Sequence, residues 1–400
     1  MSKHHKRVLG WGAAALVVGA LALVAAGCGS SSKSSSGGTT TNGLNLPTSI
    51  GKGEGALNLI EWPYYSDPSF AKQFESQTGC KIHRKDAGSS NEMVALMRGG
   101  GGGGGGQWDL VSASGDASLR LITGGDVQPV NVQLIPSWND FIPTFKSPAH
   151  NTVSGVHYGV SLQWGPNVLL YRTDKVKPGV NNWAALYDSK YKGQITIPNN
   201  PIQIADAAFY LMHSQPDLGI TDPYELNKKQ FDATVSLLKQ QRKLVKLYWN
   251  YDTDGRAAFA NGDVSLGAIW PVDTLALQAK NVPVKEVIPS DGATGWADTW
   301  MLANKAPHPN CAYLWIKYVS TPQVQAKQAL VFGETPVNPK ACPFMNKIQA
   351  GSCAKYHLNE PSSYYDTIKF WKTPTASCNH GKNDCMDYNA WQKAWTEITG

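Results

Sequence analysis

Residues 56–79 read ALNLIEWPYYSDPSFAKQFESQTG, and this stretch decides the fold class. Residues 56–62 form an alternating apolar run that ends in an aromatic side chain, a pattern typical of a strand. Residues 67–78 have helical spacing, with Pro68 suited to the first turn and Gly79 ending the helix. The stretch therefore predicts a strand, a turn and a helix.

The same alternation continues along the chain. A strand at 81–85, a helix at 91–98 and a strand at 107–114 complete a βαβαβ order, the opening of an α/β domain. A second α/β unit starts near Gly155. Its strands are expected at 156–164, 167–172, 193–198, 264–270 and 287–302, with helices at 205–214 and 229–247 and a further helix at 312–319.

The chain can cross between these two halves near 158–166 and again near 288–298, and two crossings make a hinge. The eight glycines at 99–106 follow a helix and precede a strand. A phosphate-binding glycine loop has the opposite order, so we interpret this run as a flexible loop.

The composition is that of a globular protein. Of the 400 residues, 42% are apolar and 16% charged, and 14 Trp, 16 Tyr and 10 Phe exclude a disordered chain. Without the three basic residues of the leader, 33 Lys and Arg stand against 30 Asp and Glu, a net charge of +3. That balance excludes strong nucleic-acid binding by charge alone.

The first residues resemble a bacterial lipoprotein signal. Lys3, Lys6 and Arg7 precede an apolar stretch at 8–26, and small residues lead to Cys28, whose thiol would receive the lipid. An uncleaved transmembrane helix is the alternative, because about 19 apolar residues can just span a bilayer.

Residues 29–55 are rich in Ser, Gly and Thr and predict a flexible tether with a mean reach of about 25–30 Å. We therefore expect an exported protein that a lipid anchors to the outer face of the cytoplasmic membrane, or a periplasmic one.

Six further cysteines favour disulfides outside the cytoplasm. Two pairs would close short loops and leave one long-range pair, although six cysteines allow 15 pairings. A metal site at Cys378, His380 and Cys385 is disfavoured by its spacing, and no cofactor is expected. The expected pairs are Cys80 with Cys311, Cys342 with Cys353, and Cys378 with Cys385.

Seven segments, taken together and in order, resemble the spermidine/putrescine-binding proteins of bacterial polyamine ABC importers, within the type II extracellular solute-binding proteins. The resemblance covers residues from about 56 to 340. The segments are LNLIEWPYYSDPSFAKQFESQTGCKI (57–82), QWDLVSASGD (107–116), LQWGPNVLLYRTDKV (162–176), NNWAALYDSKYKGQITIPN (181–199), FANGDVSLGAIWPVD (259–273), ATGWADTWMLAN (293–304) and FGETPVNPKA (332–341).

The resemblance implies an α/β, two-lobed clamp of the type II periplasmic-binding-protein kind. Such a clamp is a monomer that closes on a small ligand, delivers it to a membrane permease driven by an ATPase, and does no chemistry itself. The expected organisation is a leader at 1–28, a tether at 29–55, a first lobe at 56–158, a second lobe at 159–290, a return to the first lobe at 291–340 and a Cys-rich helical segment at 341–400 packed on the body.

A polyamine needs aromatic walls for its methylenes and carboxylates for its ammonium ends. Matching this sequence to the family's motifs gives Trp walls and acids on turns and strand ends. The resulting ligand-binding candidates are Trp62, Tyr65, Ser114, Asp116, Trp249, Trp270, Asp273, Trp296 and Asp298. An alternative for Asp116 is a helix N-cap.

One departure from the family bears on the ligand. Where the polyamine binders carry two acids three residues apart, this sequence has Asn200 and Gln203. Asn200 and Gln203 are therefore two further ligand-binding candidates. Amides offer oxygens but no negative charge, so a zwitterionic amino-acid derivative or another amine is the alternative ligand.

Two other functions would need different features. A secreted hydrolase would need a nucleophile and a base that converge, and His157, His213 and Asp116 are its candidates. An adhesive or cell-wall protein would use the tail at 342–400, although Trp391 and Trp395 have helical spacing typical of packing against a lobe.

Overall fold

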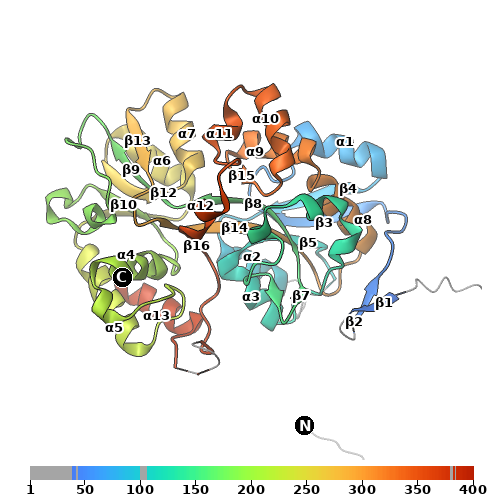
Figure 1. The fold of residues 1–400 in the computed structure, drawn as a ribbon, viewed down its shortest axis with the longest axis horizontal. Coiled ribbons are helices and arrows are strands. Elements are labelled where there is room, and N and C mark those ends of the chain that lie inside the picture. The colour runs from blue at the N-terminus through green and yellow to red at the C-terminus, as the bar shows by residue number, and fades with distance from the viewer. Residues whose placement is uncertain (1–37, 42–43, 100–105, 379–381, 383) are drawn as a thin grey trace, which may run out of the picture. The chain divides into compact units, whose positions relative to one another are not determined.

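The computed structural model describes residues 38–400 apart from 42–43, 100–105, 379–381 and 383, and these residues belong to one compact unit (Figure 1). The leader with Cys28 and most of the glycine run lie outside the described residues. Within the described chain, every helix is too short or too polar to cross a membrane.

A seven-stranded sheet organises the first lobe. Its central strand, β14 (Ala293–Leu302), is buried along its whole length and is antiparallel to both neighbours, β5 (Leu110–Ser114) and β8 (Val160–Pro166). The remaining strands are β3 (Ala56–Glu61), β4 (Lys81–Asp86), β15 (Thr335–Pro336) and β16 (Ile368–Phe370), of which β16 pairs with the start of β14.

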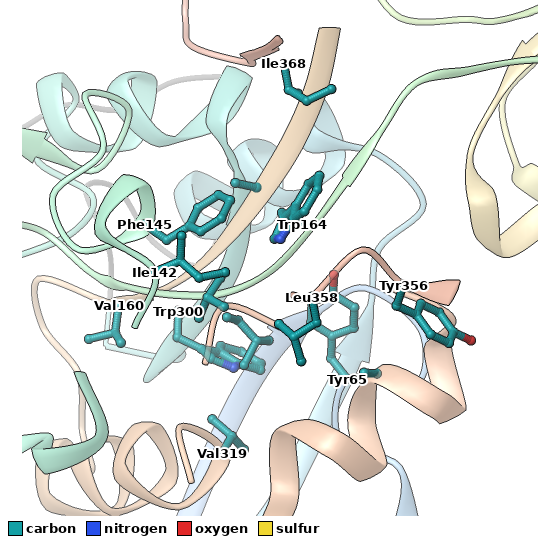
Figure 2. Packing of buried hydrophobic residues seen from close by; sticks show 14 of the residues in the cluster. Tyr65, Ile142, Phe145, Val160, Trp164, Trp300, Val319, Tyr356, Leu358 and Ile368 are labelled. Carbon is teal, nitrogen blue, oxygen red and sulfur yellow. The ribbon is translucent and has the colours of Figure 1, made fainter. Parts of the chain in front are cut away.

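Helices cover both faces of this sheet. On one face the Trp300 ring packs edge-on against Trp315, with centroids 6.1 Å apart, and Figure 2 shows Trp300 in the same core as Tyr65 and Trp164. On the other face Met97 and Leu121 share a buried cluster with β3 and β5. The covering helices are α1 (Pro68–Thr78), α8 (Pro309–Val319) and α9 (Pro322–Phe332), and α2 (Ser90–Gly99) and α3 (Gly115–Thr123).

Helix α1 shows how local sequence sets these elements. The Asp67 side chain accepts a hydrogen bond from the Ser69 N–H at 2.8 Å, which satisfies one of the free donors of the first turn. At the other end Gly79 adopts φ 75°, the left-handed conformation that ends many helices.

A five-stranded sheet organises the second lobe, in the order β11-β10-β12-β9-β13. Its strands are β9 (Val168–Arg172), β10 (Ile195–Pro198), β11 (Val245–Trp249), β12 (Leu266–Ile269) and β13 (Val284–Val287), and its helices are α4 (Gln203–Ser214), α5 (Lys228–Gln241), α6 (Asp252–Asn261) and α7 (Pro271–Ala279).

One predicted helix is too long. The helix expected at 229–247 ends at Gln241, because residues from Val245 onward pair in parallel with β10 and form strand β11. The main-chain ladder and the burial of Val245 and Trp249 outweigh a helical pattern that continues past the turn.

The two lobes are joined where β8 passes into β9 at Asn167 and where β13 passes into β14. Asn167 Nδ2 donates to Thr294 Oγ1 at 2.8 Å, and the Asp206 carboxylate of α4 accepts from both side chains. The half-buried Asp206 carboxylate therefore ties the two crossings together. The predicted α/β, two-lobed fold with two hinge crossings is confirmed.

The structure contains the three expected disulfides, Cys80–Cys311, Cys342–Cys353 and Cys378–Cys385. Since the last pair is a disulfide, its sulfurs are not free to bind the metal that was considered there, and His380 lies outside the described residues. The end of the expected tether contacts α8, because Glu54 accepts from the Asn310 and Cys311 N–H groups at 2.9 Å.

The carboxy-terminal segment crosses between the lobes once more (Figure 1). After β16, the main-chain N–H of Trp371 donates to Gly295 O at 2.7 Å. The chain then reaches α13, which lies beside α5 of the second lobe. The helices of this segment are α10 (Cys342–Ile348), α11 (Ser352–Lys355), α12 (Ser362–Asp366) and α13 (Tyr388–Thr399).

Shorter elements complete the described chain. Two antiparallel strand pairs are β1 (Gly38–Thr41) with β2 (Leu44–Pro47) and β6 (Thr152–Val153) with β7 (Val156–His157). The 3-10 helices are Val132–Leu134, Pro136–Asp140, Pro143–Phe145, Trp183–Tyr187, Ser189–Tyr191, Pro216–Leu218 and Pro339–Ala341.

Substitution of Gly115 tests the close approach of this segment to the first lobe. A Cβ at Gly115 would lie 1.8 Å from the Trp371 carbonyl oxygen, so Gly115→Ala must displace one of the two chains. We expect a loss of about 1–3 kcal/mol in the free energy of unfolding, measured with urea. Gly99→Ala is the control, since a Cβ there meets no atom within 4 Å. Equal stability of the two variants would contradict the expectation.

Candidate functional site

A cavity lies between the lobes, at the carboxyl ends of strands from both sheets. We call it the interlobe cavity. The first lobe contributes Trp62, Gly88, Ser89, Ser114, Trp296, Asp298, Phe332 and Glu334, the second lobe Pro198, Asn199, Asn200, Trp249, Asn250 and Trp270, and the carboxy-terminal segment Trp371.

Two carboxyl groups meet at one side of the cavity. Asp298 of β14 accepts hydrogen bonds from the hydroxyls of Ser114 and Tyr65. The Tyr65 oxygen also lies 2.9 Å from Glu334 Oε2. A single phenolic hydrogen can be donated to only one of the two acids, so the arrangement favours a proton on the other carboxyl. We call Asp298 and Glu334 the acidic pair.

Burial disfavours the ionised form of both acids in this pair. It raises the pKa of Asp298 to about 7, although the bonds from Ser114 and Tyr65 act in the opposite direction. Burial and the neighbouring Asp298 charge also raise the pKa of Glu334 well above its usual range. A cation placed beside the pair would reverse the effect, because it favours the charged form.

Indole rings surround the acidic pair. Trp249 and Trp270 meet edge to face with centroids 5.0 Å apart on the second lobe, and Trp62 and Trp296 line the same cavity from the first lobe. Aromatic faces of this kind attract cations and pack against methylene groups. The site can therefore hold an organic cation with an apolar body.

The second lobe adds neutral amides. Asn199 and Asn200 follow β10, Asn250 follows β11, and Asn199 Nδ2 donates to Asn250 Oδ1 at 2.9 Å. These groups offer both hydrogen-bond donors and acceptors. The cavity lining therefore carries its two acids on the first lobe and uncharged groups on the second.

Most sequence-predicted site residues meet here. Tyr65 contacts the acidic pair through its hydroxyl but is not itself a lining residue of the cavity. Those that line the cavity are Trp62, Ser114, Asn200, Trp249, Trp270, Trp296 and Asp298.

Three candidates lie elsewhere. Asp116 is fully buried and accepts from Ser90 Oγ at 2.7 Å. The N-cap interpretation of Asp116 is wrong, because α3 begins at Gly115 and its N-cap residue is Ser114. Gln203 is buried in α4 beside Asp206 and lines a different, smaller cavity.

Asp273 lies in the first turn of α7. One of its oxygens is 3.6 Å from Arg256 Nε, and the other accepts from the Trp270 N–H at 3.4 Å. Its carboxyl therefore supports the helix start and an ion pair and does not line the interlobe cavity.

Sequence reasoning missed Glu334, Phe332 and Trp371. The first two lie in FGETPVNPKA, a segment that carried the resemblance, so their position after α9 was a usable signal. Trp371 gave no such signal, because it lies beyond the matched segments and reaches the cavity only through the pairing of β16 with β14.

The hydrolase candidates are not brought together. His157 contacts Ser147 Oγ at 2.9 Å, His213 contacts the Phe209 carbonyl at 3.0 Å, and neither lines the interlobe cavity.

The raised pKa of Asp298 predicts a pH-dependent effect of Asp298→Asn on the ligand-free protein. An acid whose pKa is raised by folding stabilises the fold only at low pH, and that stability is lost as the pH rises through about 7. The variant has no charge to bury, so its melting temperature should exceed that of the wild type by several degrees at pH 8 and by less at pH 5. A melting temperature of the variant that is lower than the wild-type value by the same amount at pH 5 and pH 8 would contradict this expectation.

Comparisons with known proteins agree with the geometry. The chain is 23% identical over 292 residues to the spermidine/putrescine-binding periplasmic protein of Escherichia coli, covering 72% of this chain and 80% of that one. It is 22% identical over 328 residues to a putrescine/agmatine-binding protein of Pseudomonas aeruginosa, covering 77% and 85%.

The fold is also similar to that of a solved spermidine/putrescine substrate-binding protein of Streptococcus pneumoniae, with a TM-score of 0.67, 16% identity and coverage of 86% of this chain and 97% of that one. The family model for bacterial extracellular solute-binding proteins matches residues 69–351. The resemblance inferred from the sequence motifs is thereby confirmed, and the chain belongs to the bacterial extracellular solute-binding proteins.

Proposed function

We propose that this protein is the ligand-capturing component of an ABC importer and that it binds a small organic amine in the interlobe cavity. The single observation that carries the proposal is the acidic pair, Asp298 and Glu334, bridged by the Tyr65 hydroxyl among indole rings. The relatives named for binding putrescine, spermidine or agmatine support the same class of ligand.

The physical case rests on charge and desolvation. A buried carboxylate without a counter-ion is unfavourable, and an ammonium group supplies that counter-ion together with up to three N–H donors. Each charge-assisted hydrogen bond contributes about 1.5–3 kcal/mol, and each cation–π contact about 0.5–2 kcal/mol. The ligand therefore gains most of its affinity from the first lobe and closes the clamp through contacts to the second.

The far side of the cavity narrows the ligand class. The second-lobe lining residues Asn199, Asn200 and Asn250 are neutral, and the acids of the lining are Asp298 and Glu334. An amine with one ammonium and a polar or carboxylate far end fits this lining better than a diamine that needs an acid at each end. A short polyamine remains the first candidate because of the relatives, and an ω-amino acid is the second.

We further propose that Cys28 carries the lipid that holds the protein at the outer face of the cytoplasmic membrane. The partners are then a membrane permease, its ATPase and the membrane itself, and the protein works as a monomer without enzymatic activity.

A binding screen tests the proposal. We expect the melting temperature of the exported full chain to rise with putrescine, spermidine, agmatine or 4-aminobutyrate, and the rise to disappear in Asp298→Asn. Asp273→Asn is the matched control, since Asp273 lies outside the cavity, and its shift should equal that of the wild type. No shift with any amine, or an equal loss in both variants, would overturn the proposal.

The pH dependence of affinity gives a second test. A bound ammonium favours the ionised acidic pair, so binding expels the proton that the ligand-free pair holds. From Asp298 alone, with its pKa near about 7, the Kd of the bound amine should rise about fivefold from pH 7 to pH 6 and about tenfold from pH 6 to pH 5, and ionisation of Glu334 adds to this rise. Isothermal titration calorimetry measures both the Kd and the released proton. A Kd that stays constant between pH 5 and pH 8 would contradict the role of the pair.

A further inference from the structure

The segment 371–399, of which the structure describes all but 379–381 and 383, contacts both lobes through its described residues and lies beyond residue 351, where the family match ends. It leaves the first lobe after β16 and ends in α13, which packs on the second lobe beside α5 (Figure 1). We call it the strap.

The strap forms part of the ligand cavity. The Trp371 side chain is 3% exposed and lines the interlobe cavity. The main chain of the strap is held by the first lobe here, because the Trp371 main-chain N–H donates to Gly295 O at 2.7 Å and Thr373 Oγ1 donates to the Asp116 carbonyl at 2.7 Å. A ligand in the cavity therefore meets a wall that belongs to the strap.

The strap also holds polar groups of the second lobe in place. Trp395 Nε1 donates to Asn199 Oδ1 at 2.8 Å, and Asn199 Nδ2 in turn donates to Asn250 Oδ1 at 2.9 Å. Both asparagines line the cavity. Because Trp395 occupies the Asn199 oxygen, the Asn199 nitrogen must face Asn250, so Trp395 sets which way both amides point.

Helix α13 is anchored to the second lobe. Trp391 is fully buried and packs against Phe231 of α5 with ring centroids 6.2 Å apart, and Lys239 of α5 pairs with Glu397 at 3.3 Å. The burial of Trp391 and Trp395 is a stronger attachment than an exposed ion pair. The helix should therefore move with the second lobe.

The first residue of the same helix reaches the first lobe. The Tyr388 hydroxyl donates to Asn91 Oδ1 of α2 at 3.0 Å, and the Arg120 guanidinium of α3 lies 4.1 Å above the Tyr388 ring. Separation of the lobes would have to break both contacts, because Tyr388 is on a helix attached to the opposite lobe.

We propose that the strap is a working part of the binding site: Trp371 contacts the ligand, Trp395 positions the Asn199–Asn250 pair, and Tyr388 latches the closed clamp. The roles of Trp371 and Trp395 rest on the proposed ligand-binding function. The latch does not, because it concerns the positions of the lobes with or without ligand.

The latch is tested without any ligand. Spin labels on Ser76→Cys of α1 and Ser236→Cys of α5, two exposed positions, report the distance between the lobes. The full chain also carries Cys28→Ser, so that all of its remaining native cysteines are in disulfides and only the two introduced cysteines are labelled. Tyr388→Phe should shift the distance distribution to longer values. Tyr318→Phe is the matched control, since its hydroxyl bonds to Phe70 O within the first lobe, and it should match the wild type. Overlapping distributions for both variants would overturn the latch.

The positioning role is tested with putrescine, and with 4-aminobutyrate if putrescine does not bind. Trp395→Phe keeps a ring but removes the N–H that orients Asn199, and should raise the Kd about three- to tenfold. Trp138→Phe removes a similar volume and an indole hydrogen bond, to Lys146 O at 3.1 Å, within the first lobe and away from the strap, and should leave the Kd unchanged. Equal Kd values for the two variants would overturn the positioning role. Absence of binding to the wild type would overturn the proposed function, while the distance measurement would still decide the latch.

Discussion

The burial of Asp298 in the middle of strand β14 is the constraint on which the rest of the site depends. Its main chain pairs with β5 at Ser114 and with β8 at Gln163, so the strand cannot turn its carboxyl toward solvent. Two hydroxyls and a second acid, Glu334, gather around it instead. Hydrogen bonds satisfy the oxygens, but the environment still disfavours a negative charge, and a cation is the group that it lacks.

The two lobes divide the work of recognition. The first lobe supplies the charge, and the second supplies aromatic faces and amides, so a ligand that satisfies both must lie between them. The crossings are joined by Asp206, which accepts from Asn167 and Thr294, and Asn167 also accepts from Trp270 Nε1 at 3.2 Å. Trp270, a wall of the cavity, is thus hydrogen-bonded to the hinge. A ligand that contacts Trp270 can therefore change the relative position of the lobes through this bond.

The strap makes this clamp different from one joined by two hinge strands alone. A third length of chain connects β16 to α13. It passes so close to Gly115 that no side chain at that position would fit beside the Trp371 carbonyl. A two-hinge clamp opens by rotation about its crossings. Here the rotation is also limited by how far the strap extends and by whether Tyr388 stays on the first lobe.

The sequence alone determined the α/β class, the two lobes and most of the cavity walls, because strand and helix periodicity is local and the Trp and Asp residues lie in short segments typical of the family. The sequence did not predict the end of α5, because the pairing of β11 with β10 decides where that helix stops. Tertiary structure alone decided that Asp273 pairs with Arg256 while Glu334 joins Asp298, and that Trp371 reaches the cavity. Which carboxyl faces a ligand depends on contacts between residues far apart in the chain, and no local pattern encodes those contacts.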